Sequence, residues 1–172
     1  MKRTKRGPLI ESAEKQRKRP SNFAQAEKSP GSPAKVLADS ERRLQSVIQG
    51  SPIPTFVIGR DRRILYWNRA LEELSGIRAH EVLGTADHWR AFYRSGARPC
   101  LADLLVDQDF DAIESWYAGK CRKSTLIEEA YEATDFFPEL GEGGRWLRFT
   151  AALIRGSGGE VVGAQETLED IT

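Results

Sequence analysis

Aromatic and basic side chains cluster after residue 88, and their chemistry suits a small anionic ligand. Trp89 and Tyr93 are four residues apart, and Arg98 follows them. An apolar pocket that contains one or two cations suits a carboxylate, because a guanidinium can donate two parallel hydrogen bonds to it. Arg148, from a later segment, would supply a second cation. The alternative is that the aromatic side chains form core and the arginines lie at the surface.

The chain has two cysteines, Cys100 and Cys121. They are too few for a disulfide framework and lack CxxC spacing, so we expect free thiols in a reducing compartment. Arg98 lies near Cys100 and Arg122 follows Cys121, so positive neighbours could lower the thiol pKa values and allow oxidant sensing. The alternative is that both cysteines are buried or incidental. Cys100 is included in the predicted ligand-binding set.

The sequence lacks common metal and nucleotide motifs. His80 is followed by Glu81, but Gly84 stands where an HExxH zinc motif has its second histidine. The glycines of GSGGEVVG, residues 156–163, join two strand-like runs, whereas a phosphate-binding loop joins a strand to a helix. We therefore predict no metal site, no catalytic residue and no enzymatic activity in this chain.

Residues 1–34 form a basic segment that is predicted to be flexible. Residues 1–35 contain ten Lys or Arg against three acidic residues, although the whole chain carries a net charge of only +1. This charge could attract nucleic acid or an anionic membrane surface. Because neither aromatic interleaving nor a helix-turn-helix accompanies it, we do not expect a nucleic-acid partner. The segment also lacks a signal peptide, and no later window could span a bilayer, so we expect a cytoplasmic protein.

An amphipathic helix is predicted over residues 35–50. Its apolar residues Leu37, Leu44, Val47 and Ile48 recur at helical spacing and form one stripe. A Gly-Ser-Pro sequence then ends the helix. Because such a stripe would otherwise be left in water, we predict that this helix mediates a homodimer.

Residues 51–172 are predicted to form one α+β domain. TFVIG and RILYW make a β-hairpin, and Asn68 then caps a short helix. Short helices separated by glycines follow as far as residue 119. The longer strands are predicted at residues 124–137, 144–156 and 160–172. These elements predict a five-stranded antiparallel sheet with several short helices over one face.

The stretch ILYWNRALEELSGIRAHEVLG resembles the PAS family of sensory domains. An apolar strand is followed by Asn68, by a helix that ends at Gly76, and by Glu81 and Gly84 in the next turn. The last stretch, in which GEVVG leads to a final Asp-Ile-Thr, is also similar to the family. Its matching residues are Gly163, Asp170, Ile171 and Thr172. The resemblance covers about residues 40–172.

This resemblance implies a curved sheet, helices over one face and a ligand cavity between them. Haem-binding members use an imidazole from the helical side, which would be His88 here. Flavin-binding members place a glutamine where Gln165 lies, on one sheet face with Gly163, but their Asn-Cys-Arg-Phe-Leu-Gln motif is missing. The long segment 85–109 leaves the cofactor open, with haem or flavin as alternatives. The predicted ligand-binding set is Trp89, Tyr93, Arg98, Cys100, Arg148 and Gln165.

The resemblance also implies a non-enzymatic role in signal transduction. The domain would bind a small organic ligand, a second copy of itself or an effector protein, and would relay a population shift through its terminal helix and last strand. Family members often precede histidine kinases of two-component systems, so such activity would belong to an attached effector. A DNA-associated regulator of transcription is the alternative. Both a receptor fragment and a stand-alone protein fit the ending of the chain, and Met1 favours the second.

Overall fold

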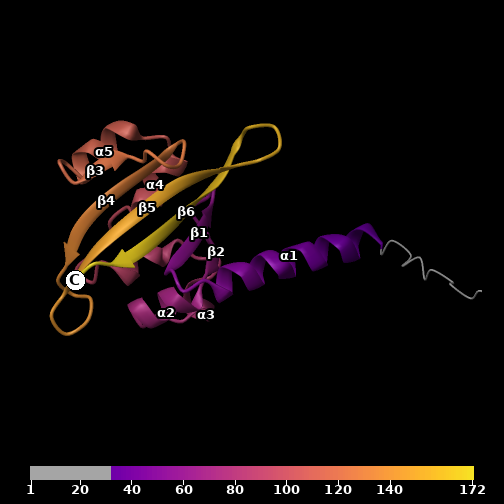
Figure 1. The fold of residues 1–172 in the computed structure, drawn as a ribbon, viewed down its shortest axis with the longest axis horizontal. Helices are drawn as coiled ribbons and strands as arrows, with labels where there is room; N and C mark the ends of the chain where they lie inside the picture. The colour runs from indigo at the N-terminus through magenta and orange to yellow at the C-terminus, as the bar shows by residue number, and fades with distance from the viewer. Residues whose placement is uncertain (1–31) are drawn as a thin grey trace, which may run out of the picture.

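The computed structural model describes residues 32–172, so most of the predicted basic segment, residues 1–34, lies outside the described residues. Helix α1 (Pro33–Gly50) projects away from a domain built on one sheet (Figure 1). The helix begins two residues before its predicted start, because the fixed φ of Pro33 suits the first position of a helix.

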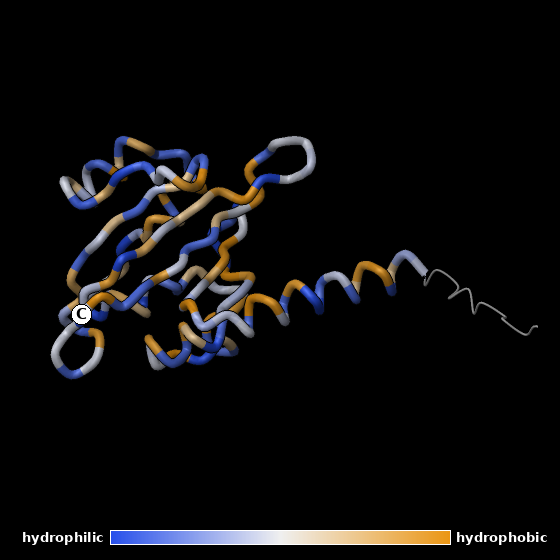
Figure 2. The backbone as a smooth tube through the Cα atoms, in the orientation of Figure 1, coloured by the Kyte–Doolittle hydropathy of each residue, from blue (hydrophilic) through white to orange (hydrophobic). Residues whose placement is uncertain are grey.

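Helix α1 is amphipathic, as predicted. Figure 2 shows hydrophobic and hydrophilic residues alternating along it. None of its residues is buried against the rest of the described chain. No helix within residues 32–172 is long and apolar enough to cross a membrane.

The sheet is antiparallel and has six strands, in the order β2-β1-β6-β5-β4-β3. The strands are β1 (Thr55–Gly59), β2 (Ile64–Trp67), β3 (Cys121–Lys123), β4 (Ala130–Phe137), β5 (Arg145–Arg155) and β6 (Val161–Asp170). Strand β6 pairs with β5, as predicted, and also with β1, so the last strand lies inside the sheet.

The prediction of five strands was wrong by one. Strand β3 pairs with the edge of β4, where Cys121 lies opposite Ala133. Its three residues, two of them basic, are too short a run to show an alternating pattern. The predicted strand at 124–137 also begins late, at Ala130, because the preceding residues form a turn in which Glu129 adopts a φ of 56°.

Short helices cover one face of the sheet. They are α2 (Arg69–Ser75), α3 (Ala79–Val82), the 3-10 helix η1 (Asp87–Ala91), α4 (Leu101–Val106) and α5 (Phe110–Trp116). Helix α4 contacts both β5 and β6, whereas α3 lies against β2. This arrangement buries the apolar side chains between the helices and the sheet.

The core lies between the helices and the sheet. On β5, Leu147, Phe149 and Ala151 are buried, whereas Arg148, between the first two, is exposed on the other face. Aromatic rings fill much of this interior, and each large apolar side chain that is fully buried contributes roughly 1.5–3 kcal/mol. The buried aromatic residues are Phe56, Trp67, Phe92, Tyr117, Phe137 and Phe149.

Candidate functional site

A buried hydrogen bond between His88 and Asp103 lies where η1 meets α4. The Nε2 atom of His88 is 2.7 Å from Oδ2 of Asp103, and both side chains are almost inaccessible to solvent. The same Asp103 oxygen accepts a hydrogen bond from the backbone N–H of Cys100 at 2.9 Å. Asp103 therefore caps α4 and positions the imidazole at the same time.

A second buried carboxyl group joins the last strand to α4. Oε2 of Glu166, on β6, accepts a hydrogen bond from the backbone N–H of Ala102 at 2.8 Å. Burial raises the pKa of Glu166 to about 8, the Ala102 N–H acts in the opposite direction, and the nearby charge of Asp103 raises it further. Glu166 is thus a protonatable link between the strand that ends the chain and the helical layer.

Arg98 lies within a group of aromatic rings. Its guanidinium carbon is 4.9 Å from the ring centre of Tyr93, 5.2 Å from that of Trp116 and 5.6 Å from that of Tyr117. Its Nη2 atom also donates to the backbone oxygen of Trp116 at 3.1 Å. Cation–π contacts on three rings hold this guanidinium in one place.

An open hollow of about 450 Å³ lies beside these groups, between η1, α4 and α5. Its lining includes Arg62, His88, Trp89, Arg98, Asp103 and Trp116. A concave site of this size with aromatic walls and a few polar groups can hold a small organic molecule. We call it the Arg98 hollow.

The structure brings part of the predicted ligand-binding set together. Trp89 and Arg98 line the Arg98 hollow, Tyr93 supports the guanidinium, and Cys100 is buried behind them at the start of α4. Sequence reasoning missed Asp103 and Glu166, although Glu166 shares the inward register of its apolar neighbours on β6.

Arg148 and Gln165 are not part of this group. Arg148 forms an ion pair with Glu169 on the face of the sheet that the helices do not cover. Gln165 is exposed on β6, next to the inward-facing Glu166. Because neighbouring strand residues point to opposite faces, neither side chain reaches the helix-covered interior.

The surroundings of His88 do not fit a haem. Its ring stacks on Phe56 at a centroid distance of 5.3 Å within the packed core, and its Nε2 atom is already hydrogen bonded to Asp103. The flavin alternative loses its main support, because Gln165 lies on the open face of the sheet. We therefore assign neither cofactor.

The cysteines are not acidified as their basic neighbours suggested. Burial raises the pKa of the Cys100 thiol well above its usual value, and burial raises that of Cys121 to about 11. Cys100, His88 and Asp103 offer ligand atoms within 4.8 Å of one another. Because Nε2 of His88 and Oδ2 of Asp103 are already hydrogen bonded, we assign no metal to this group.

Asn68, the first predicted motif residue, joins three segments. Its Oδ1 atom accepts hydrogen bonds from the backbone N–H groups of Leu71 and Thr55, both at 2.9 Å. Its Nδ2 atom donates to the Ile53 oxygen at 2.7 Å and to the Ile48 oxygen of α1 at 3.3 Å. Asn68 therefore caps α2, as predicted, and also ties α1 to the sheet.

The other motif residues near it shape tight turns. Gly76 ends α2 with a φ of 76°, and Gly84 has a φ of 77°, a region that favours glycine. The carboxylate of Glu81 accepts a hydrogen bond from the backbone N–H of Arg78 at 2.8 Å and so caps α3. The first resemblance motif thus has a direct structural basis.

The second motif secures β6 at both ends. A Cβ atom on Gly163 would lie 2.2 Å from the backbone oxygen of Ile58, so only glycine allows this approach of β6 to β1. The backbone N–H of Trp146 donates to Oγ1 of Thr172 at 3.0 Å, and that of Ile171 donates to the Trp146 oxygen at 2.9 Å. Asp170 pairs with Arg145.

The comparisons agree with this fold. Residues 42–86 match the family model described as PAS fold. The PAS domain of BvgS from Bordetella pertussis has a TM-score of 0.51 at 20% identity, over 78% of this chain and 87% of that chain. An RNA-binding light-oxygen-voltage receptor has a TM-score of 0.51 at 21% identity, over 84% of this chain but 36% of that chain. A comparison with curated proteins gives no match. The predicted resemblance is confirmed, and the chain has a PAS-type fold.

Proposed function

We propose that the chain is a sensory and interaction domain that pairs with a second copy of itself through α1. It would relay conformational changes between α1 and the sheet and would have no catalytic activity of its own. The observation that carries this proposal is the contrast between the exposed apolar stripe of α1 and its firmly attached last turn. A PAS-type fold preceded by such a helix is better suited to relay a conformational change to a partner than to act as a receptor by itself.

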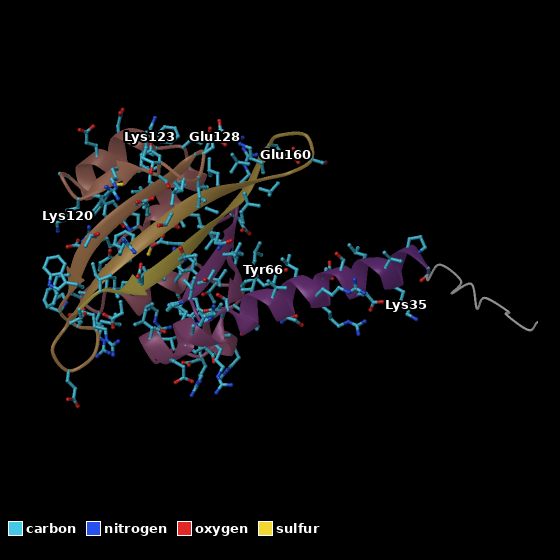
Figure 3. All side chains as sticks on the ribbon, viewed as in Figure 1. Lys35, Tyr66, Lys120, Lys123, Glu128 and Glu160 are labelled. Atoms are coloured by element: carbon cyan, nitrogen blue, oxygen red, sulfur yellow. The ribbon has the colours of Figure 1, made fainter. Side chains whose placement is uncertain are left out.

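The apolar stripe of α1 has the spacing of a coiled-coil seam. Leu37 and Leu44 are seven residues apart and Val47 follows three residues later, and their side chains are 61%, 51% and 71% exposed. Figure 3 shows the side chains of α1, including that of Lys35, standing clear of the sheet. A second copy presents the same stripe, so two-fold pairing would cover both at once.

The last turn of α1 is attached to the sheet through side-chain amides. Nε2 of Gln49 donates to the backbone oxygen of Trp67 at 2.8 Å, and its Oε1 accepts from the N–H of Arg69 at 3.1 Å. With the Asn68 amide, these hydrogen bonds make the end of α1 continuous with the junction of β2 and α2. A changed pairing of α1 would therefore favour one arrangement of this junction over another.

Light scattering on the purified full chain tests the proposal. We expect a mass of twice 19.3 kDa for the unaltered chain. Leu44→Glu places a charge in the stripe and should give the monomer, whereas Ser46→Glu adds the same charge on the opposite side of the helix and should leave the dimer intact. A monomer for the unaltered chain, or equal loss of mass in both variants, would contradict the proposal.

A further inference from the structure

We propose that the Arg98 hollow binds a small carboxylate, with the Arg98 guanidinium as its anchor. This site lies on the helical layer, away from α1, and goes beyond the proposed function because binding there does not require self-association. The inference rests on the unused hydrogen-bonding capacity of Arg98 and His88 and on the walls of the hollow.

Arg98 has no ion-pair partner in the part of the chain that the structure describes. Within residues 32–172, no carboxylate oxygen lies within 4.0 Å of its guanidinium nitrogens. Of its five N–H donors, only one on Nη2 has an acceptor among the described residues, the Trp116 oxygen, and the buried Nε has none there. A half-buried guanidinium with spare donors favours an anionic ligand, because unpaired donors away from water are costly.

The guanidinium is also held in position before any ligand arrives. The rings of Tyr93, Trp116 and Tyr117 surround it, and Tyr117 is itself fixed by a hydrogen bond from its hydroxyl to the Pro99 oxygen at 3.4 Å. A prepositioned guanidinium loses little conformational freedom when a carboxylate binds to it.

His88, another residue of the lining, also has a polar atom without a partner among the described residues. Among the described residues, only the Nε atom of Arg98 and the Nδ1 atom of His88 are buried side-chain polar atoms without a partner. Both residues line the Arg98 hollow. In the neutral ring, Nε2 must carry the proton that it donates to Asp103, so Nδ1 is left as an acceptor. A hydroxyl group or a water molecule that enters with the ligand would satisfy it.

The acidic residues around the hollow are already engaged. Asp103 accepts from His88, Asp107 pairs with Arg62, and Oδ1 of Asp109 caps α5 by accepting from the Ala112 N–H at 3.0 Å. A cationic probe in the test measures the effect of these acidic residues on binding. Trp89 and Trp116 add flat apolar walls, which suit a ligand with a planar body beside its carboxylate.

Isothermal titration calorimetry with three probes that share a phenyl ring tests this site. The probes are benzoate, benzamide and benzylamine, which carry negative, zero and positive charge on the same ring. We expect saturable binding of benzoate to the full chain, and binding of the other two that is weaker by about tenfold or more. Arg98→Met should weaken benzoate binding by about tenfold or more. Arg98→Lys should weaken it by less, because an ammonium keeps the charge but cannot donate two parallel hydrogen bonds to the carboxylate.

Arg94→Met is the matched control. Arg94 is exposed, lies four residues before Arg98 and does not line the hollow, so this variant should bind benzoate as the unaltered chain does. No benzoate binding, equal binding by Arg98→Met, or tighter binding of benzylamine would overturn the inference. Because the Leu44→Glu monomer keeps the hollow, its benzoate binding should be unchanged, so failure of the dimer proposal and failure of the ligand site give different results.

Discussion

The side-chain amide of Asn68 donates to the backbone oxygen of Ile48 at 3.3 Å, which connects the last turn of α1 to the start of α2. The same side chain makes shorter hydrogen bonds to Ile53 and Thr55, and it is fully buried. The amide of Asn68 therefore fixes, together with that of Gln49, how α1 meets the sheet.

Substitution of Asn68 should destabilise the domain and remove one of the two side-chain attachments of α1. Asn68→Ala leaves several buried backbone groups without partners, so we expect the free energy of unfolding to fall by about 2–4 kcal/mol. Urea unfolding followed by tryptophan fluorescence measures the change. If Asn68→Ala lowers the free energy of unfolding by less than about 1 kcal/mol, the hydrogen bonds of Asn68 do not stabilise this junction.

The stability of the domain should depend on pH through Glu166. Its folded-state pKa of about 8 lies above its ordinary value of 4.5, so between these pH values the folded state holds a proton that the unfolded state has lost. The contribution of Glu166 to the free energy of unfolding is therefore largest below about pH 4.5. It falls as the pH rises toward 8, by an amount on the order of a few kcal/mol.

Comparison with Glu166→Gln isolates this effect. The glutamine keeps the size of the side chain and an acceptor for the Ala102 N–H but cannot ionise. The difference in unfolding free energy between this variant and the unaltered chain should grow in favour of the variant from pH 5 to pH 8. Two parallel stability curves would mean that Glu166 ionises in the folded state as it does in the unfolded chain.

Gly163 should tolerate no side chain. In Gly163→Ala the new Cβ atom would lie 2.2 Å from the Ile58 oxygen, so β1 and β6 must separate. We expect a loss of more than about 2 kcal/mol in the free energy of unfolding. Gly143→Ala is the matched control, because no atom lies within 4 Å of the added group. Equal stability of the two variants would be inconsistent with the close approach of these strands.

Local sequence patterns predicted most of the fold, because capping and alternation are local effects. Asn68 could be assigned as a helix cap from the strand before it and the apolar helix after it. Strand β3 could not be predicted from the sequence, because its three residues form a strand only by pairing with the free edge of β4.

The candidate site depends on contacts between residues distant in sequence, so only part of it could be predicted. Asp103 meets His88 across 15 residues, and Glu166 meets the Ala102 N–H across 64. Choosing Gln165 in place of Glu166 was an error of one residue in register, which moves a side chain to the other face of the sheet.

Disulfide cross-linking through α1 tests the central claim most directly. In a Cys121→Ser background, which removes the less buried native thiol, Leu44→Cys should form an interchain disulfide on mild oxidation, because seam residues of two paired helices lie close enough for this bond. Ser46→Cys, on the opposite side of the helix, should remain monomeric on a non-reducing gel. Absence of the covalent dimer for Leu44→Cys, or equal cross-linking at both positions, would contradict pairing through the apolar stripe of α1.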